Sequence, residues 1–284
     1  MSERAVGVFD SGVGGLSVLK ALMAEMPHER FVYVADSLNA PYGEKGDTFV
    51  SQRTQAITDY LLVHHRIKAI VVACNTATAA AVHEIRTRYP TLPMVGIEPA
   101  LKPAASTTTT GFVGVMATRG TLGSAKFGKL LLSFAQNTEF ITQSCDGLAY
   151  AIEQSTALET PDCSLEVQEL CRLYTDAMGR SFGKGAGQID TLVLGCTHYV
   201  FALPTLRALI GKEVTILETG LPVAKQTKRL LETAQLQAQE NSWPSTSNEV
   251  QIQLYTTGEL EMLQGAVKRW LDLPEQLCNS VQIP

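Results

Sequence analysis

Short runs of apolar residues, rich in Val, Ile and Phe, alternate along this chain with longer stretches of helical period. The runs that predict strands are Ala5–Phe9, Phe31–Ala35, Lys68–Ala73, Met94–Ile97, Phe112–Ala117, Thr191–Gly195 and Val214–Leu217. The stretches that predict helices are Leu16–Met26, Thr48–His64, Thr76–Arg88, Ser164–Met178 and Leu221–Leu236. Continuously apolar strands are typical of parallel sheets that are covered on both faces. The pattern therefore predicts an α/β fold with open parallel sheets.

The length and one polar segment predict two domains. A chain of 284 residues exceeds one typical domain. The segment Pro103–Gly111, which holds four threonines in a row, marks a crossing between halves. We expect residues 1–97 and about 210–284 to form a first α/β domain, to which the chain returns, and residues 98–209 to form a second. Both would be doubly wound, with the active site in the cleft between them.

Composition and charge exclude several classes of protein. The chain is 45% hydrophobic and 18% charged, which is typical of an ordinary globular protein. A net charge of -5 and a pI near 5.6 argue against a nucleic-acid surface, which needs a basic face. The sequence contains no apolar run of 18 residues and begins without a signal-peptide pattern. We expect a cytoplasmic protein with no nucleic-acid or membrane partner.

The six cysteines are too sparse for a disulfide framework, and none forms a CxxC zinc pattern. We therefore expect a reducing compartment and no metal. A free cysteine is usually a small buried packing residue. That interpretation applies to Cys145, Cys163, Cys171 and Cys278, which have no chemical neighbours in the sequence.

Two segments with the same order of residue types set the other two cysteines apart. Ile70–Thr76 and Thr191–Thr197 each contain an apolar strand, a small residue, a cysteine and a hydrogen-bonding residue. Ligands bind at the carboxyl ends of the strands in open α/β sheets. Two related domains that face each other would place Cys74 and Cys196 on opposite walls of one cleft.

The residues next to these cysteines are suited to tuning a thiol and holding a carboxylate. A cysteine just before a helix lies in the positive field of the helix, so we expect a lowered thiol pKa. Asn75, Thr76 and Thr197 supply donors for an anion. Asp10 near Cys74 and His198 near Cys196 are the expected tuning partners, although a lone histidine is more often structural.

Two loops add candidates at other strand ends. The loop after Ala5–Phe9 begins with Asp10 and Ser11 and continues with a glycine turn whose spacing matches neither a dinucleotide fingerprint nor a phosphate loop. A simple capping role for Asp10 is the alternative. In the loop after the second strand, Pro41 and Gly43 would fix a turn and leave Tyr42 and the Gly43 amide free to donate hydrogen bonds.

Two matched thiols fit one reaction well. Inversion of the α-carbon of an amino acid removes a proton from one face and returns a proton to the other, which needs a base and an acid of similar pKa. We find no signature of a Schiff-base lysine, so the sequence predicts catalysis without a cofactor, in a closed cleft with preorganised donors.

At these residues the chain resembles the glutamate racemases of the cofactor-independent aspartate/glutamate racemase superfamily. The motifs that carry the resemblance are Phe9–Gly15, Pro41–Gly43, Ala73–Ala77, Gly96–Ala100, Gly114–Thr118 and Leu194–Tyr199, in that order. The chain departs from the usual family pattern at Ala35, Asp146, Val200 and Glu218–Gly220, none of which is a proposed proton carrier.

The resemblance implies a pseudo-symmetric two-domain fold with glutamate between the domains. It implies that Cys74 exchanges the proton of D-glutamate and Cys196 that of L-glutamate. The positions that match substrate contacts in the family are Asp10, Ser11, Tyr42, Gly43, Asn75, Thr76, Thr118, Thr197 and His198. Glu153 would be a further tuning acid, beside Asp10 and His198. The resemblance also implies a homodimer that supplies D-glutamate for peptidoglycan synthesis.

The residues themselves leave three other functions open. The chain could racemise aspartate or another acidic amino acid, because pocket depth cannot be judged from sequence. It could be a cysteine hydrolase or amidase in which Cys196 attacks with the help of His198, although such an enzyme has no use for a second matched cysteine. It could also bind an amino acid without catalysis.

Overall fold

The structure is a computed structural model that describes residues 3–156, 164–238 and 251–284. Its strands are β1 Val6–Asp10, β2 Phe31–Ala35, β3 Ala69–Val72, β4 Met94–Gly96, β5 Phe112–Ala117, β6 Glu139–Ser144, β7 Thr191–Gly195, β8 Thr215–Leu217, β9 Ile252–Thr256 and β10 Cys278–Ser280. Its α-helices are α1 Leu16–Glu25, α2 Asp47–His65, α3 Asn75–Arg88, α4 Leu101–Thr107, α5 Arg119–Leu122, α6 Ala125–Phe134, α7 Leu148–Ser155, α8 Leu165–Asp176, α9 Leu203–Ile210, α10 Gly220–Thr233 and α11 Leu260–Leu271. Short 3-10 helices are η1 Val13–Gly15, η2 Ser37–Asn39, η3 Tyr42–Glu44, η4 Thr197–Ala202 and η6 Glu275–Leu277. The predicted strands and helices are all present, with bounds shifted by a few residues.

The strands form two parallel sheets that share one topology. The larger sheet has the order β10-β9-β2-β1-β3-β4, and the smaller has the order β6-β5-β7-β8. All the pairings are parallel. In both sheets the first strand lies between the second and the third, and the fourth lies beyond the third. The repeated order confirms the predicted pseudo-symmetric α/β fold.

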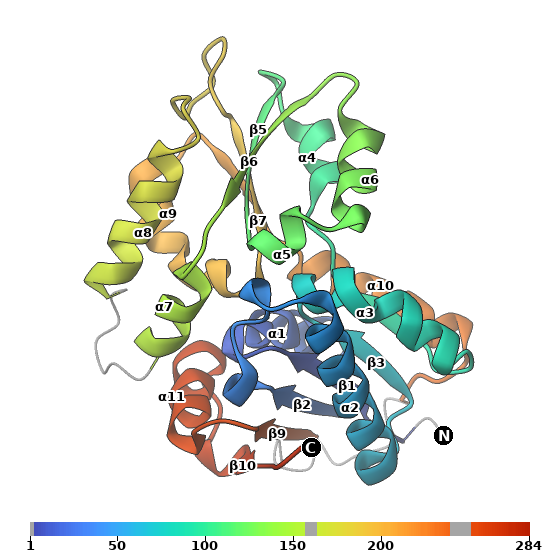
Figure 1. The fold of residues 1–284 in the computed structure, drawn as a ribbon. Helices are drawn as coiled ribbons and strands as arrows, with labels where there is room; N and C mark the ends of the chain where they lie inside the picture. The colour runs from blue at the N-terminus through green and yellow to red at the C-terminus, as the bar shows by residue number, and fades with distance from the viewer. Residues whose placement is uncertain (1–2, 157–163, 239–250) are drawn as a thin grey trace.

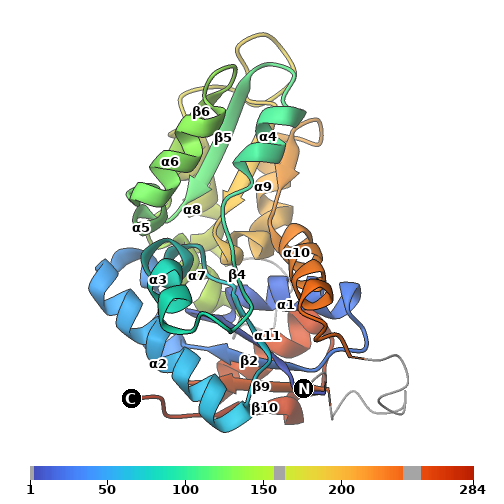
Figure 2. The ribbon, with the colours of Figure 1, turned by 90° about the vertical axis from the view of Figure 1, so that its right-hand side faces the viewer.

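Alternate residues of each strand lie on opposite faces of the sheet, and helices cover both faces. Val8 packs with α1 and α11, whereas the next residue, Phe9, packs with α2 and α3. In the smaller sheet, Val193 packs with α4 and α6, and its neighbour Leu194 packs on the other side. Figures 1 and 2 show the two lobes stacked one above the other, with helices around each sheet. The burial of both faces explains why the strands are continuously apolar.

The predicted domain boundary needs one correction. Residues 210–284 were assigned to the first domain, but Thr191 of β7 pairs with Thr215 of β8 in the smaller sheet. The chain therefore returns to the larger sheet after Leu217, at α10, and not at residue 210. The sequence of such a short strand does not indicate whether it pairs at the edge of the smaller sheet or joins the larger sheet.

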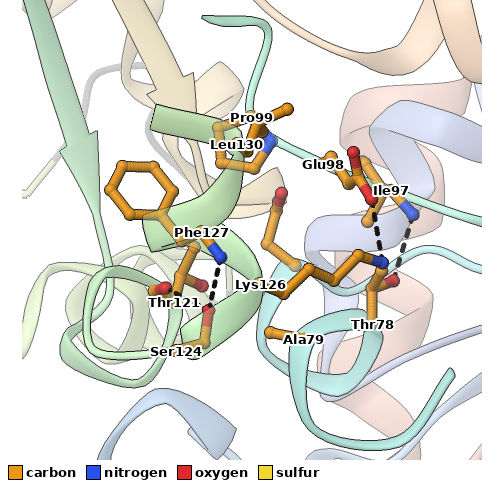
Figure 3. Close-up of a pocket in the computed structure, with 11 residues that line it drawn as sticks. Thr78, Ala79, Ile97, Glu98, Pro99, Thr121, Ser124, Lys126, Phe127 and Leu130 are labelled. Carbon is orange, nitrogen blue, oxygen red and sulfur yellow. Dashed lines mark hydrogen bonds and ion pairs between the residues drawn. The ribbon is translucent and has the colours of Figure 1, made fainter. Parts of the chain in front are cut away.

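The described chain passes between the sheets at two places, after β4 and after β8. At the first, the Ile97 amide donates to Thr78 Oγ1 at 3.0 Å, and Lys126 of α6 pairs with Glu98 at 2.8 Å. A small pocket lined by Thr78 and Ala79 of α3 and by Phe127 and Leu130 of α6 lies here (Figure 3). At the second, the Glu218 carboxylate accepts from the Gly220 amide at the start of α10. Both crossings carry an acid within two residues after the fourth strand of a sheet.

Candidate active site

The site is built from residues that follow the carboxyl ends of strands in both sheets. Asp10 ends β1, and Thr118 follows the equivalent strand β5. Cys74 and Cys196 follow β3 and β7, the third strand of each sheet, and so occupy the same place in the repeated topology. The two ends meet directly, because Thr197 Oγ1 donates to Asp10 Oδ2 at 2.9 Å. The structure thus brings the two matched cysteine segments to one interface.

Cys74 lies at the N-terminus of α3 and is 5% exposed. Its sulfur accepts from the Ala77 amide at 3.5 Å, and its S–H points to Ser11 Oγ at 3.7 Å. Burial raises the pKa of the Cys74 thiol well above its usual range, and the charge of Asp10 raises it further, against the hydrogen bonds from Ala77 and Ser11. The predicted lowering by the helix is therefore wrong for Cys74, because the lost solvation of the thiolate outweighs the field of the helix.

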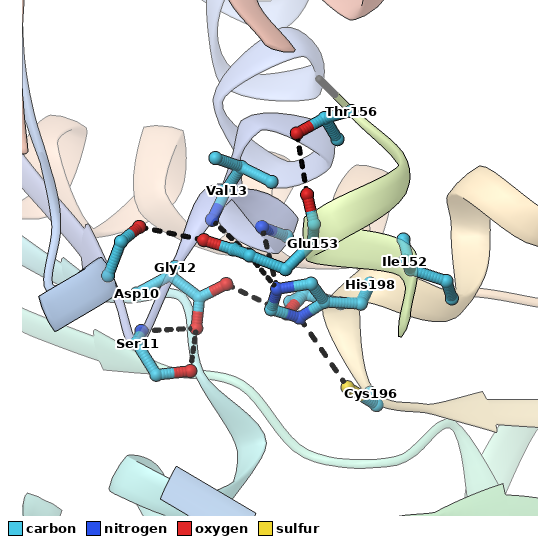
Figure 4. Close-up of polar contacts among 12 residues, drawn as sticks. Asp10, Ser11, Gly12, Val13, Ile152, Glu153, Thr156, Cys196 and His198 are labelled. Carbon is cyan, nitrogen blue, oxygen red and sulfur yellow. Dashed lines mark hydrogen bonds and ion pairs between the residues drawn. The ribbon is translucent and has the colours of Figure 1, made fainter. Parts of the chain in front are cut away.

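Cys196 has different surroundings, although it is also buried. It precedes the short 3-10 helix η4, and no backbone amide caps its sulfur. Its Sγ lies 3.8 Å from Nδ1 of His198, and Nε2 of the same ring lies 2.7 Å from Oε2 of Glu153. Figure 4 shows carboxylate, imidazole and sulfur in sequence. Glu153 comes from α7, so the smaller lobe supplies the whole chain of contacts.

The charges of this buried group support one another. Burial lowers the pKa of His198, but its hydrogen bonds to Cys196 and Glu153 and their charges raise it well above the usual value. Burial raises the pKa of Glu153, but the contacts with His198, Ser37 and the Val13 amide lower it overall. An ionised carboxylate and an imidazolium are thus the favoured forms beside Cys196.

Asp10 is fully buried and connects the two lobes. Its Oδ1 accepts from the Ser11 amide at 2.7 Å, and its Oδ2 accepts from Thr197 across the interface. Burial raises the pKa of Asp10, while the charge of His198 and the hydrogen bond from Thr197 act against that rise. The charge of Asp10 therefore acts on Cys74, and its hydrogen bond reaches Thr197, the neighbour of Cys196, so its contacts extend beyond those of a helix cap.

Asn75 is a buried polar residue next to Cys74. The residue is 5% exposed, and its amide oxygen and amide nitrogen have no hydrogen-bond partner among the described residues. Each buried amide atom without a hydrogen-bond partner lowers the free energy of unfolding by on the order of 1–3 kcal/mol. Asn75 directly follows Cys74, so the unpaired amide is suited to a polar substrate group held beside that thiol.

Three threonine hydroxyls meet where the lobes touch. Thr76 Oγ1 lies 3.0 Å from Thr118 Oγ1 and 3.4 Å from Thr121 Oγ1, and Thr118 donates to Thr121 at 3.0 Å. Thr76 and Thr118 were expected in the site. Thr121 was missed, although its spacing of one helical turn from Thr118 is a usable signal.

The loop after β2 departs from one expectation. The Tyr42 side chain is 1% exposed, and its hydroxyl donates to Asp36 Oδ2 at 2.6 Å. The sequence predicts a Tyr42 hydroxyl that is free to donate to a ligand, but this hydroxyl already donates to Asp36. Gly43 packs so closely on Thr118 that an added Cβ would clash with the threonine side chain. This contact explains a glycine at the position better than its turn geometry does.

The remaining described cysteines are also buried. Cys145 follows β6, Cys171 lies in α8 and Cys278 begins β10. Burial raises the pKa of Cys278 to about 11. These features are those of packing residues. Cys163 lies outside the described residues.

The described residues contain neither a metal-binding cluster nor a membrane-spanning helix. Within residues 3–156, 164–238 and 251–284, no three His, Cys, Asp or Glu side chains lie together so that they could hold a metal ion. In the same ranges, none of the helices has both the length and the apolar character needed to cross a membrane.

The arrangement fits two kinds of chemistry, and Cys74 distinguishes them. A carboxylate, an imidazole and a thiol in sequence could serve a cysteine hydrolase. Such a reaction leaves no role for a second buried thiol in the equivalent place of the other lobe. A pair of opposed acid and base groups uses both thiols.

Comparisons with known proteins agree with the second reading. Residues 16–227 match the Asp/Glu/Hydantoin racemase family model. A glutamate racemase of Ectopseudomonas mendocina is 45% identical over 94% of both chains. A glutamate racemase of Pseudomonas aeruginosa PAO1 is 47% identical over 84% of this chain and 85% of its own length.

Solved structures give the same result. Glutamate racemase RacE1 of Bacillus anthracis has a TM-score of 0.82 at 26% identity, covering 100% of this chain and 99% of its own. Escherichia coli glutamate racemase, in complex with L-glutamate and the activator UDP-MurNAc-Ala, has a TM-score of 0.77 at 29% identity and covers 94% of this chain and 95% of its own. The chain belongs to the Asp/Glu/Hydantoin racemase family, among its glutamate racemases.

Proposed function

We propose that this chain interconverts L-glutamate and D-glutamate without a cofactor, with Cys74 and Cys196 as the groups that exchange the α-proton. The observation that carries the proposal is the pair of buried thiols, one from each lobe, that follow equivalent strands. The identity of 45% to a glutamate racemase over 94% of the chain supports glutamate as the substrate. Inversion needs a base on one face of the α-carbon and an acid on the other.

In the L-to-D direction, Cys196 begins as a thiolate and Cys74 as a thiol. Cys196 takes the α-proton of L-glutamate and forms an S–H bond. Cys74 gives its own proton to the opposite face of the α-carbon and becomes the thiolate. In the D-to-L direction the two residues exchange roles, so protons balance in each turnover.

The electrostatics support this division. The raised pKa of Cys74 favours its thiol form at neutral pH. The raised pKa of His198 favours an imidazolium beside the Cys196 sulfur, and a neighbouring cation stabilises a thiolate. We therefore propose that Cys196 is the base that acts on L-glutamate.

The substrate carboxylates would be held by groups that already line the interface. The Asn75 amide atoms have no partner among the described residues, and the hydroxyls of Thr76, Thr118 and Thr121 meet where the lobes touch. We propose that these donors, with Ser11, Gly43 and Thr197, bind the two carboxylates. A closed, dry site strengthens such hydrogen bonds as negative charge develops at the α-carbon.

The same proposal covers the setting of the enzyme. We propose a cytoplasmic homodimer whose D-glutamate supplies peptidoglycan synthesis. The buried cysteines of the described residues, with no disulfide among them, fit a reducing compartment. Light scattering of the purified protein tests the dimer.

The decisive experiment incubates the protein with each glutamate enantiomer in deuterated water without added cofactor. Optical rotation and α-proton exchange are followed together. We expect racemisation with deuterium incorporation from both enantiomers. In Cys196→Ser, exchange from L-glutamate should fall most, and in Cys74→Ser, exchange from D-glutamate. Cys278→Ser, which removes a buried thiol at the sheet edge, is the control.

The outcomes separate the alternatives. Exchange with aspartate but not glutamate would move the substrate to a shorter acid. Hydrolysis of amides that needs Cys196 but not Cys74 would favour the hydrolase. Tight binding of glutamate without exchange would leave a binding protein.

A further inference from the structure

The loop from Asp36 to Glu44 connects the larger lobe to the smaller at three points. Ser37 Oγ donates to Glu153 Oε1 at 2.7 Å. The Gly147 amide donates to Glu44 Oε1 at 3.1 Å, and Gly43 packs on Thr118. The conformation of this loop therefore decides how the lobes meet around the two thiols.

One buried carboxylate organises that loop. Asp36 is 0% exposed and accepts from the Tyr42 hydroxyl at 2.6 Å and from Asn39 Nδ2 at 3.2 Å, both within the loop. Thr257, just after β9, donates to it at 2.8 Å and accepts from the Leu38 amide at 3.2 Å. A carboxylate at this depth is stable only while its charge is paired.

Arg53 of α2 supplies the opposite charge. Its Nη2 donates to Asp36 Oδ1 at 2.9 Å, and its Nε donates to Asp36 Oδ2 at 3.1 Å. The remaining nitrogen, Nη1, donates to the carbonyl oxygens of Ile283 at 3.0 Å and Pro284 at 2.8 Å. The Arg53 side chain is 11% exposed, and Ile283 is buried in the same core as Tyr42. One guanidinium thus joins the last described residues to the loop.

We propose that Arg53 is a positioning residue for the loop from Asp36 to Glu44. Ile283 and Pro284 hold the Arg53 guanidinium in place through their carbonyl oxygens. The proposal rests on the proposed racemase function. Arg53 orients Asp36, Asp36 fixes the Tyr42 hydroxyl, and the adjacent Gly43 then meets Thr118 in the closed site. Arg53 touches no reacting group, so its loss weakens substrate binding and closure more than proton transfer.

The geometry makes Lys a poor substitute for Arg53. A guanidinium spans two carboxylate oxygens and still has a nitrogen for the two carbonyls, whereas an ammonium is a single point charge. Arg53→Lys therefore keeps the charge beside Asp36 and loses the fixed orientation. Arg53→Met loses both.

The test measures kcat and KM for each enantiomer of glutamate in Arg53→Lys, Arg53→Met and a chain that stops after Gln282, with thermal unfolding of each. Arg88→Met removes an exposed, ion-paired arginine and is the matched control. We expect KM to rise at least about 10-fold in Arg53→Lys, while kcat changes less than about 3-fold, because uniform binding is lost. The shortened chain should shift KM in the same direction, by about 3-fold, and Arg88→Met should not change it.

A folded Arg53→Lys variant with the KM of the wild type would overturn the proposal. A variant in which kcat falls about 10-fold while KM stays unchanged would overturn it as well. If Arg53→Met does not fold, Arg53→Lys and the shortened chain still decide the matter. If the wild-type protein does not racemise glutamate, the proposed function is refuted instead. The thermal unfolding data would then still show, independently of activity, how each variant affects the stability of the fold.

Discussion

Oε2 of Glu153 lies 2.7 Å from Nε2 of His198, and both side chains are almost completely buried. The imidazole bridges this carboxylate and the Cys196 sulfur, so His198 connects Glu153 to the thiol. Cys74 has a charged neighbour of the opposite kind, Asp10, which favours its protonated form. The two thiols therefore have different charged neighbours, although they occupy equivalent places in the fold.

Glu153→Gln should weaken the base at Cys196. Without the carboxylate, burial dominates and the pKa of His198 falls, so the imidazolium that stabilises the thiolate is lost. We expect kcat/KM for L-glutamate to drop about 100-fold, within the range for general acid–base catalysis. Steady-state kinetics over pH would show it, and Glu166→Gln, an exposed acid at the start of α8, is the control. An unchanged profile would remove Glu153 from the tuning of Cys196.

The same pair should make stability depend on pH. The folded pKa of His198 is raised, so its contribution is fully present below the ordinary value of about 6.5 and is lost as pH rises through the folded pKa. Urea unfolding of the wild type and of Glu153→Gln from pH 6 to pH 10 measures how this contribution to the free energy of unfolding changes with pH. The variant should lose most of this dependence.

Asp10→Asn should make Cys74 more reactive. The charge of Asp10 is one cause of the raised thiol pKa, so its removal lowers that pKa. We expect the pH midpoint for alkylation of Cys74, followed by peptide mass spectrometry, to fall. Alkylation of Cys278 within the same protein is the internal control. A midpoint that does not move would mean that burial alone sets the pKa.

Gly14→Ala should disrupt the site while leaving both lobes folded. A Cβ at Gly14 would clash with the His198 ring, whereas one at Gly46 would meet nothing within 4 Å. A displaced imidazole no longer serves Cys196, and we expect kcat/KM to fall about 100-fold, as small misplacements can cause. Gly46→Ala should change it less than about twofold. Equal activity of the two variants would contradict the close approach of the lobes.

Asp190→Asn should destabilise the smaller lobe. The Asp190 carboxylate accepts from Thr108, Thr109 and Thr110, which explains the row of threonines. Although burial acts to raise the pKa of Asp190, hydrogen bonds from these residues lower it to about 2. We expect a loss of about 1–3 kcal/mol at pH 7, because donors lose their charged acceptor.

The sign of the pH effect checks that interpretation. A depressed pKa gives stability that is present above about 3.8 and lost as pH falls towards 2. Urea unfolding at pH 7 and pH 3 should therefore bring wild type and Asp190→Asn closer together in acid. Asp176→Asn, an exposed acid at the end of α8, should behave as wild type.

The sequence by itself determined the alternation of strands and helices, because continuous apolar runs cannot face water on either side of a sheet. It also singled out Cys74 and Cys196, since a thiol after a strand recurred with the same neighbours. The edge strand β8 was assigned to the wrong sheet, because three residues carry no signal of which partner they pair with.

Only the tertiary structure decided the protonation and the partners of the site. The local sequence of Cys74 predicts a lowered pKa, but burial and Asp10, a residue far away in the chain, reverse the direction. The sequence predicts a Tyr42 hydroxyl that is free to bind a ligand. In the structure this hydroxyl donates to Asp36, and Arg53 pairs with the same carboxylate. Desolvation and charge pairing depend on which segments meet in space, and that information lies in the packing of two lobes and not in any single motif.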